Sequence, residues 1–222
     1  MSKEIIVDVE KLSERSQEID VKKQGKLMQE IILAIKEKME ELDLVSLSAP
    51  QIGYPYRIFC VKFGKKNGRL KEETRTLVNP VVDGIKGIVL DREKSVSIPD
   101  KEFIIPRNNE VRVVYQNPLG TPTGQKFMGK AAAVIQEMMD YLDGILLSDI
   151  GLEIDHRFDE ATEEEKNELI DAYMQSLDLK KKDLNEEIES NEELKGIKDA
   201  VDFMQSVKEG KTKLGNPLKE KE

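Results

Sequence analysis

Three short segments, in a fixed order along the 222 residues, constrain the fold of this chain more than any other feature. The first reads SLSAPQIG at residues 46–53, the second EKSVSIP at residues 93–99, and the third AVIQEMMDYLDG at residues 133–144. One short match of this kind is weak evidence, whereas three in order at a characteristic spacing indicate a shared architecture. The three segments together therefore predict one fold for the region that they span.

The first two segments resemble those of peptide deformylases, which use a divalent metal to remove the formyl group from the N-terminal methionine of new bacterial proteins. The family's first segment ends in Ala-Pro-Gln, an apolar residue and Gly, as residues 49–53 do here, but its two leading glycines are replaced by Leu44 and Ser46. The family's second segment begins Glu-Gly-Cys. In this chain Lys94 stands for the glycine and Ser95 for the cysteine.

The third segment keeps the family's frame and changes its functional side chains. Gln136 and Gly144 match the family pattern Gln-His-Glu-x-x-His-apolar-x-Gly. The first histidine of that pattern is replaced by Glu137, the glutamate by Met138 and the second histidine by Tyr141. The resemblance extends over roughly residues 8–152 and implies an α+β fold of the peptide-deformylase type for residues 1–155. Small antiparallel or mixed sheets would surround a central helix, followed by a C-terminal helical extension.

The replaced positions are those that hold the metal in the family. The resemblance implies two histidines four residues apart on one helix face, a cysteine thiolate, and a glutamate that moves the proton. The corresponding residues here are Ser95, Glu137, Met138 and Tyr141. Hydroxyl groups are poor ligands for zinc or iron, and one carboxylate does not hold such an ion tightly. The sequence therefore predicts no metal, no cofactor and no catalytic residue, that is, a family member that is not an enzyme.

The substitutions also have a structural interpretation. Glu137 and Tyr141 lie on one helix face, so the tyrosine hydroxyl, together with Ser95, is expected to donate hydrogen bonds to the carboxylate. Gln51 persists from the family's site, where the resemblance implies that its amide and a backbone N–H near Val96 stabilise an oxyanion. A structural role for Gln51, in support of its own loop, is the favoured interpretation.

Other candidate ligands and nucleophiles are few. An oxygen site for Mg or Ca from Glu93, Glu137 and Asp140 is an alternative, although Asp140 should point elsewhere on the helix. The single histidine, His156, follows the third segment and is expected to be exposed or satisfied. The single cysteine, Cys60, lies in an apolar run and is expected to be a buried strand residue rather than a nucleophile.

Hydrophobic periodicity predicts helices on both sides of a β-rich middle. Residues 22–43 carry an apolar stripe at helical spacing, and another helix is expected from about residue 129 to 142. Short strands are expected between them at residues 57–63, 74–82, 87–90, 102–105 and 110–116, with a turn at 64–68 and a break at Pro80.

The composition changes near residue 155. From Arg157 to Glu222 the chain has 19 acidic and 12 basic residues, so this third carries most of the net charge of −9. One amphipathic helix is expected to start at a capping box of Thr162 and Glu165, and a second near Ser190. An acidic helical extension is therefore predicted for residues 156–210, and a flexible tail for residues 211–222.

Three functions are compatible with these features. The favoured one is a binding or structural module whose C-terminal helices dock on the body, on a partner protein or on a second copy. The alternative is an altered hydrolase or residual deformylase acting on formyl-methionyl peptides, with Ser95 as nucleophile and Glu137 as base. The third is binding of N-terminal peptides without cleavage.

The composition excludes some partners. A net charge of −9 and a pI near 5.0 disfavour binding to nucleic acids and to anionic membranes. The apolar runs are far shorter than the roughly 20 residues that span a bilayer, and the N-terminus lacks the apolar core of a signal peptide. A cytoplasmic location is therefore expected, with incorporation into a larger particle such as a virion left open.

Overall fold

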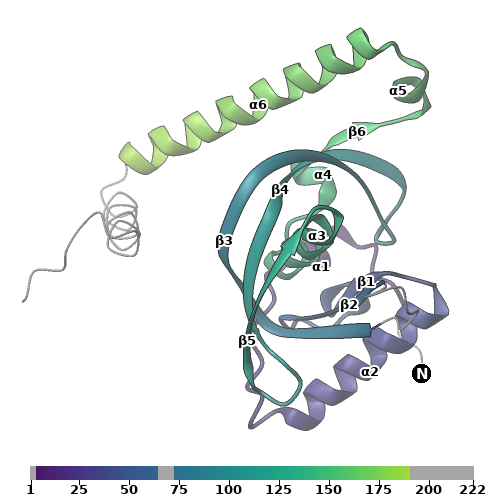
Figure 1. Cartoon of the computed structure of the whole chain (residues 1–222), viewed down its shortest axis with the longest axis vertical. Helices are drawn as coiled ribbons and strands as arrows, with labels where there is room; N and C mark the ends of the chain where they lie inside the picture. The colour runs from purple at the N-terminus through teal and green to yellow at the C-terminus, as the bar shows by residue number, and fades with distance from the viewer. Residues whose placement is uncertain (1–3, 65–72, 191–222) are drawn as a thin grey trace, which may run out of the picture. The chain divides into compact units, whose positions relative to one another are not determined.

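The computed structural model describes residues 4–64 and 73–190, with side chains up to residue 176 (Figure 1). Contacts divide the chain into two compact units, residues 1–160 and residues 161–222. All of the strands in the described part of the chain belong to the first unit, which also holds the three segments singled out above.

The strands form one antiparallel sheet. Its order is β1-β2-β3-β4-β5, and β6 pairs with β4. The strands are β1 (Ser46–Ser48), β2 (Ile58–Phe63), β3 (Glu73–Ser95), β4 (Ile98–Gln116), β5 (Pro122–Met128) and β6 (Leu152–Ile154). In β4 the expected alternation places Val111, Val113 and Tyr115 in the core, because alternate side chains of a strand face the same side.

The prediction of several short strands between residues 74 and 116 is wrong. β3 and β4 pair along almost their full lengths as a continuous ribbon, which curves around the helix α3 (Figure 1). Pro80 does not end β3, because it falls in a register shift between Val78 and Val81 where the ladder is already interrupted. Gly87 carries the strand onward with a φ of +66°, a conformation that suits glycine. Most of the predicted turn at 64–68 lies outside the described residues.

The helix of the third segment is the centre of the first unit. α3 (Lys130–Asp143) begins within one residue of its predicted start, and the prediction is confirmed. Ile135, Met138 and Leu142 are buried in one core cluster with Phe59 of β2. The helix therefore owes its position to the apolar stripe that the sequence shows, packed against the inner face of the sheet.

The end of α3 is fixed by the N-terminal part of the chain. Gly144 ends the helix with a φ of +74°, and a Cβ placed on it would lie 2.3 Å from the carbonyl oxygen of Ser13. The N–H of Ser16 donates to the carbonyl of Leu142 at 2.9 Å. Glycine is therefore needed at this position both for its backbone conformation and for the close approach of another backbone.

A second core lies between the other long helix and the sheet. α2 (Gly25–Glu41) confirms the helix predicted at residues 22–43, with a later start. Its buried residues Ile31, Ile35 and Met39 pack in one cluster with Ile58 of β2. A short helix, α1 (Val9–Leu12), begins with the Asp8 side chain as its cap.

The two residues that occur once in the chain lie where the sequence predicts. Cys60 is fully buried in β2, with its Sγ 3.3 Å from Thr76 Oγ1, and burial raises the pKa of the thiol to about 11. His156 is exposed at the start of α5 (His156–Glu160). Neither residue lines the pocket around Glu137 that is described below, although His156 lines a separate hollow together with Ser95 and Val96.

Short elements complete the first unit, and a long helix begins the second. α4 (Leu147–Ile150) and α5 follow α3, with β6 between them. α6 (Glu163–Ser190) begins at the predicted capping box: the N–H of Thr162 donates to the Glu165 carboxylate at 2.8 Å, and the N–H of Glu165 donates back to the threonine hydroxyl at 3.3 Å.

The rest of the C-terminal prediction is only partly covered by the structure. α6 runs for 28 residues and passes the end of the first predicted amphipathic stripe. The second helix predicted near Ser190 and the tail at 211–222 lie outside the described residues. Docking of these helices on a partner stays a prediction. Among the helices of the described ranges, none is long and apolar enough to cross a membrane.

Candidate active site

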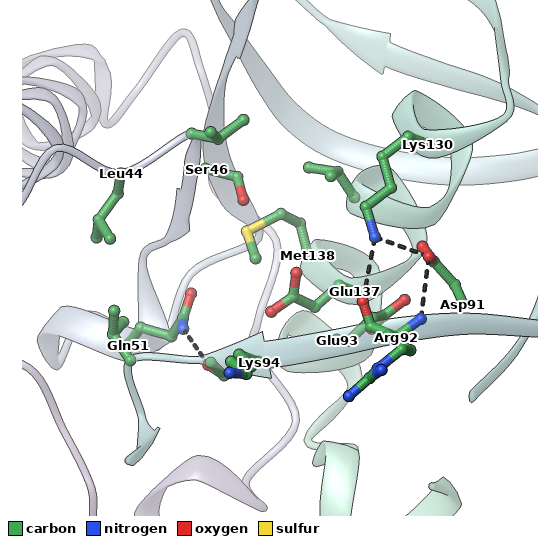
Figure 2. A pocket seen from close by; sticks show the side chains of 14 residues that line it. Leu44, Ser46, Gln51, Asp91, Arg92, Glu93, Lys94, Lys130, Glu137 and Met138 are labelled. Atoms are coloured by element: carbon green, nitrogen blue, oxygen red, sulfur yellow. Dashed lines mark hydrogen bonds and ion pairs between the residues drawn. The ribbon is translucent and has the colours of Figure 1, made fainter. Parts of the chain in front are cut away.

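A pocket of about 270 Å³ lies where the three segments meet (Figure 2). Its walls come from the residues around the start of β1, the C-terminal end of β3 and one face of α3. Among the residues that line it are Leu44, Ser46, Gln51, Asp91, Glu93, Lys94, Ser95, Val96, Lys130, Glu137 and Met138. Five of the six residues predicted for the site thus line one cavity, and the sixth, Tyr141, lies behind Ser95, to which it is hydrogen-bonded.

Gln51 is held in place by its own loop. It lies in the 3₁₀ turn η1 (Pro50–Ile52) and is 2% exposed. Its Oε1 accepts hydrogen bonds from the N–H of Ser48 at 3.0 Å and from the Ser48 hydroxyl at 2.9 Å. Its Nε2 makes longer bonds, of 3.4 Å to Ser95 Oγ and 3.3 Å to Ser97 Oγ. The carbonyl end therefore supports the loop, while the amide N–H groups are held more loosely beside the pocket.

Ser95 collects hydrogen bonds at the end of β3. Its Oγ accepts from the Tyr141 hydroxyl at 2.7 Å, from Gln51 Nε2 and, at 3.3 Å, from the N–H of Ser97. A serine hydroxyl has one hydrogen to donate in addition to its lone pairs. Because the surrounding donors already approach its lone pairs, the Ser95 O–H is available to an acceptor in the pocket.

Tyr141 does not contact the group that the sequence predicts. Its hydroxyl donates to Ser95 rather than to the Glu137 carboxylate, so the expected Tyr141–Glu137 hydrogen bond is not formed. The tyrosine is fully buried, and burial is the main cause that raises the pKa of its hydroxyl; the hydrogen bond to Ser95 opposes that rise. Tyr141 thus acts as a neutral donor that orients Ser95.

Glu137 extends into the pocket from α3 (Figure 2). Within the described residues its carboxyl makes no hydrogen bond and no salt bridge. Burial in the pocket wall raises its pKa to about 8, and the negative charge of Glu93 adds to the rise, while the positive charge of Arg107 partly offsets it. At neutral pH the group is therefore mostly a protonated carboxylic acid that loses its proton near pH 8.

A buried ion network lies beneath Glu137. Arg107 of β4 is 4% exposed and donates to both oxygens of Glu93 at 2.7 and 2.8 Å, and to Asp140 at 2.5 Å. Burial disfavours the arginine's charge, but the hydrogen bonds that Arg107 donates to Glu93 and the negative charge of Asp140 outweigh this effect and raise the pKa of the guanidinium. Asp140 points away from the pocket, as the sequence predicts, and burial raises its pKa to about 6.

A second, smaller ion pair joins the same two elements, α3 and β3. Lys130 Nζ lies 2.7 Å from Asp91 Oδ1 and donates to the carbonyl of Arg92 at 3.1 Å. The other oxygen of Asp91, Oδ2, is buried and has no hydrogen-bond partner in the part of the chain that the structure describes. Figure 2 shows this pair beside Glu93.

The rim residues obstruct the pocket less than the sequence suggests. Lys94 replaces a glycine of the family pattern, which should add bulk at the rim. Its side chain is 70% exposed, and its ammonium lies 3.7 Å from Glu102, a residue that does not line the pocket. Leu44 and Ser46, which replace the two other glycines, do line the wall.

The residues present do not fit the divalent metal of the resemblance. The family's ligand positions hold Ser95, Glu137 and Tyr141, and the two hydroxyl groups are hydrogen-bonded to each other at 2.7 Å. A tyrosine whose pKa is raised and a serine do not supply the anionic or imidazole donors that zinc and iron prefer. Over residues 4–64 and 73–190, no group of three His, Cys, Asp or Glu side chains is placed to hold a metal ion.

Comparison with known proteins decides the family. The family model described as polypeptide deformylase matches residues 3–156. The chain belongs to the peptide deformylase family. A peptide deformylase of Dictyoglomus turgidum is 29% identical over 152 residues, which make up 67% of this chain and 95% of that protein. The region that the family model matches includes all three segments.

Solved structures agree with this family. The crystal structure of a probable peptide deformylase from Synechococcus phage S-SSM7 has a TM-score of 0.60 and 30% identity, over 67% of this chain and 97% of that one. The peptide deformylase of Thermotoga maritima has a TM-score of 0.60 and 27% identity, over 68% and 97% of the two chains. The predicted α+β fold of the peptide-deformylase type is therefore confirmed.

These relatives correct one prediction. The sequence predicts a family member that is not an enzyme, and this is contradicted by relatives that are named peptide deformylase, an enzyme. Replacement of the ligands changes which side chains can carry out the chemistry, and it does not by itself show that activity is lost. In this chain Glu137 is the ionisable side chain of the third segment that reaches the pocket.

Sequence reasoning missed the ion network. Glu93 belongs to the second segment, but its partner Arg107 lies 14 residues further along the chain, and no local pattern marks that arginine. The raised pKa of Glu137 follows first from burial and then from the charge of Glu93, and residue spacing alone predicts neither.

Proposed function

We propose that the protein binds the N-terminal formyl-methionyl end of a polypeptide in this pocket and hydrolyses the formamide with Glu137 as the acid–base group. The observation that carries the proposal is the Glu137 carboxyl, which faces the cavity and, within the described residues, makes no hydrogen bond or salt bridge. The substrate class is taken from the peptide deformylase family to which the chain belongs. This is the altered hydrolase that the sequence offers as an alternative.

The reaction assigns a role to each group. The Glu137 carboxylate takes a proton from a water molecule, whose oxygen attacks the formyl carbon. The protonated Glu137 then gives that proton to the amide nitrogen as the C–N bond breaks. The products are formate and a free N-terminal amine, and no oxidant or reductant is required.

The developing negative charge on the formyl oxygen needs donors. The loosely bound amide of Gln51 and the free hydrogen of the Ser95 hydroxyl lie on the same side of the pocket. Preorganised donors of this kind stabilise an oxyanion without a cost of reorganisation at the moment of reaction. Within the described residues, the partners of the Ser95 hydroxyl are Tyr141, Gln51 and the N–H of Ser97, and none of these is a base. Ser95 is therefore assigned as a donor here, rather than as the nucleophile that the sequence suggests.

The pKa of Glu137 sets the working range. A general base is most effective when its pKa lies near the operating pH. With a pKa of about 8, about one tenth of the carboxyl is ionised at pH 7, and the fraction rises towards pH 9. The rate with the free enzyme should therefore increase with pH through about pH 8.

Release of formate from a formyl-methionyl tripeptide tests the proposal. Turnover should be insensitive to a strong chelator and should follow the ionisation of Glu137. Glu137→Gln should reduce it at least about 100-fold, because the replacement removes the proton acceptor. Glu18→Gln, at an exposed glutamate outside the pocket, is the matched control and should leave turnover unchanged.

Three results would contradict this assignment. The first is no formate above background from the wild-type chain. The second is turnover that a chelator removes, since that would point to a bound metal. The third is turnover that Glu137→Gln leaves intact, which would assign the proton transfer to another group.

A further inference from the structure

One stretch of β3 is exposed on both faces. All ten residues from Val81 to Leu90 are exposed. Six of them are aliphatic and each exposes between 40% and 65% of its surface: Val81, Val82, Ile85, Ile88, Val89 and Leu90. Contiguous exposed apolar surface of this kind on a soluble protein typically marks an interaction site.

The same stretch is an open sheet edge. β4 pairs with one edge of β3 along this stretch, whereas β2 covers the other edge only up to Val78. Within the described ranges, no strand pairs with that second edge between residues 81 and 90. An open edge presents unpaired N–H and C=O groups and is a template for a further strand. Edges that must stay single are usually protected by charges, yet this one carries only Asp83 and Lys86 among the ten residues.

We propose that two copies of this chain pair antiparallel through this edge, about a twofold axis between Gly84 and Ile85. In this register Asp83 of each copy lies opposite Lys86 of the other, so two ion pairs form by symmetry. Val81 also meets Ile88, which pairs aliphatic side chains across the axis. Opposite charges and aliphatic pairs directly across two strands both stabilise their association.

The charges are available for this role. Within the part of the chain that the structure describes, Lys86 makes no hydrogen bond or ion pair. Asp83 lies 3.2 Å from Arg112, in a salt bridge whose arginine side chain is 59% exposed. Asp83 is also the extra residue of a bulge, since the register shifts between Val82 and Gly84. A solvated pair of this kind contributes little, so Asp83 can interact with Lys86 of the second copy as well.

Another register is less favourable. Sliding the strands so that Asp83 meets Arg92 would also pair opposite charges. However, Arg92 already donates to Glu102 and to Asp159, each at 2.9 Å. That register also leaves Lys86 opposite an aliphatic side chain. The axis between residues 84 and 85 therefore matches both charges, and this self-complementarity favours a second copy over an unrelated strand.

Sedimentation equilibrium of the full chain, with reciprocal charge changes, tests the register. The wild-type chain should dimerise. Asp83→Lys and Lys86→Asp should each raise the dimer Kd about tenfold or more, because both symmetric pairs become like-charged. An equimolar mixture of the two variants should form a heterodimer with near wild-type affinity, since each then opposes unlike charges. The double variant, Asp83→Lys with Lys86→Asp, should also dimerise with near wild-type affinity.

Two controls separate other causes. Arg112→Ala removes the partner of Asp83 within the chain and should change the dimer Kd less than about twofold. Lys26→Asp makes the same charge change as Lys86→Asp at an exposed position on α2 and should also leave the dimer intact. Equal weakening by either control would overturn the register.

Hydrogen exchange identifies the occupant. The amides of residues 81–90 should become protected as the protein concentration rises through the dimer Kd. A chain that stays monomeric at roughly 100 µM, where an association of micromolar Kd is nearly complete, overturns the proposal. Protection that does not depend on concentration also overturns it, because the edge would then be covered by another part of the same chain. If the mixture of Asp83→Lys and Lys86→Asp does not regain near wild-type affinity, Asp83 and Lys86 do not pair across the interface.

Discussion

Replacing Glu137 with glutamine should change how the stability of the protein depends on pH. The glutamine has nearly the same shape and does not ionise. In the folded wild-type chain burial raises the pKa of this carboxyl to about 8, from an ordinary value of 4.5. Between these two values the folded state holds a proton that the unfolded state has lost. The contribution of this group is therefore fully present below about pH 4.5 and is lost progressively as the pH rises to about 8.

The size of the effect follows from the two pKa values. Each unit of difference corresponds to about 1.4 kcal/mol, so the whole shift sets an upper limit of roughly 5 kcal/mol. The carboxyl lines a pocket, and solvent there moderates the cost of its charge. Between pH 5 and pH 8 the free energy of unfolding of the wild type should fall by roughly 3 kcal/mol more than that of Glu137→Gln.

Urea unfolding of both chains at pH 5, 6, 7 and 8 measures this difference directly. The stability of the variant relative to wild type should increase steadily with pH, whatever its offset at pH 5. The free energy of unfolding of Glu18→Gln should change with pH as that of the wild type does, since the Glu18 side chain is exposed. Parallel curves for Glu137→Gln and wild type would refute the argument, because they would show a carboxyl that ionises as easily in the folded state as in the unfolded state.

Three further predictions concern stability and reactivity. Arg107→Met should lower the free energy of unfolding by about 3–5 kcal/mol in chemical denaturation, because it leaves two buried carboxylates without their partner. Gly144→Ala should cost roughly 2–4 kcal/mol and lower the Tm, since its φ is +74° and its Cβ would clash with Ser13. Cys60 should not react with a thiol reagent at pH 8 until the protein unfolds, because its thiol is buried and its pKa is about 11. Fast labelling of the native chain would contradict that burial.

The sequence predicts the elements whose signal is local. The stripe containing Ile135 and Leu142 predicts α3, and the capping box of Thr162 and Glu165 predicts the start of α6. The continuity of β3 is not predictable in the same way. Pro80 resembles a strand end, and only the register shift beside it, which depends on the neighbouring strand, allows the strand to continue.

In the candidate site, too, some features can be predicted from the sequence and others cannot. The three segments bring Gln51, Ser95 and Glu137 to one pocket, and family-typical spacing suffices to predict that meeting. The partner of Tyr141 is not predictable from helical spacing, because Ser95 competes with Glu137 for its hydroxyl from a strand 46 residues away. Which of the two receives the proton depends on the approach of β3 to α3, a distance that only the assembled fold sets.

The buried position of Arg107 between Glu93 and Asp140 restricts how this sequence can change over time. Loss of the arginine alone leaves both carboxylates without their cation. Loss of either carboxylate leaves the buried arginine with one of its two partners. Replacement of all three by well-packed apolar side chains is often nearly neutral. Substitutions at these positions should therefore be accepted together and rarely singly, so that β3, β4 and α3 vary as a linked group around the pocket.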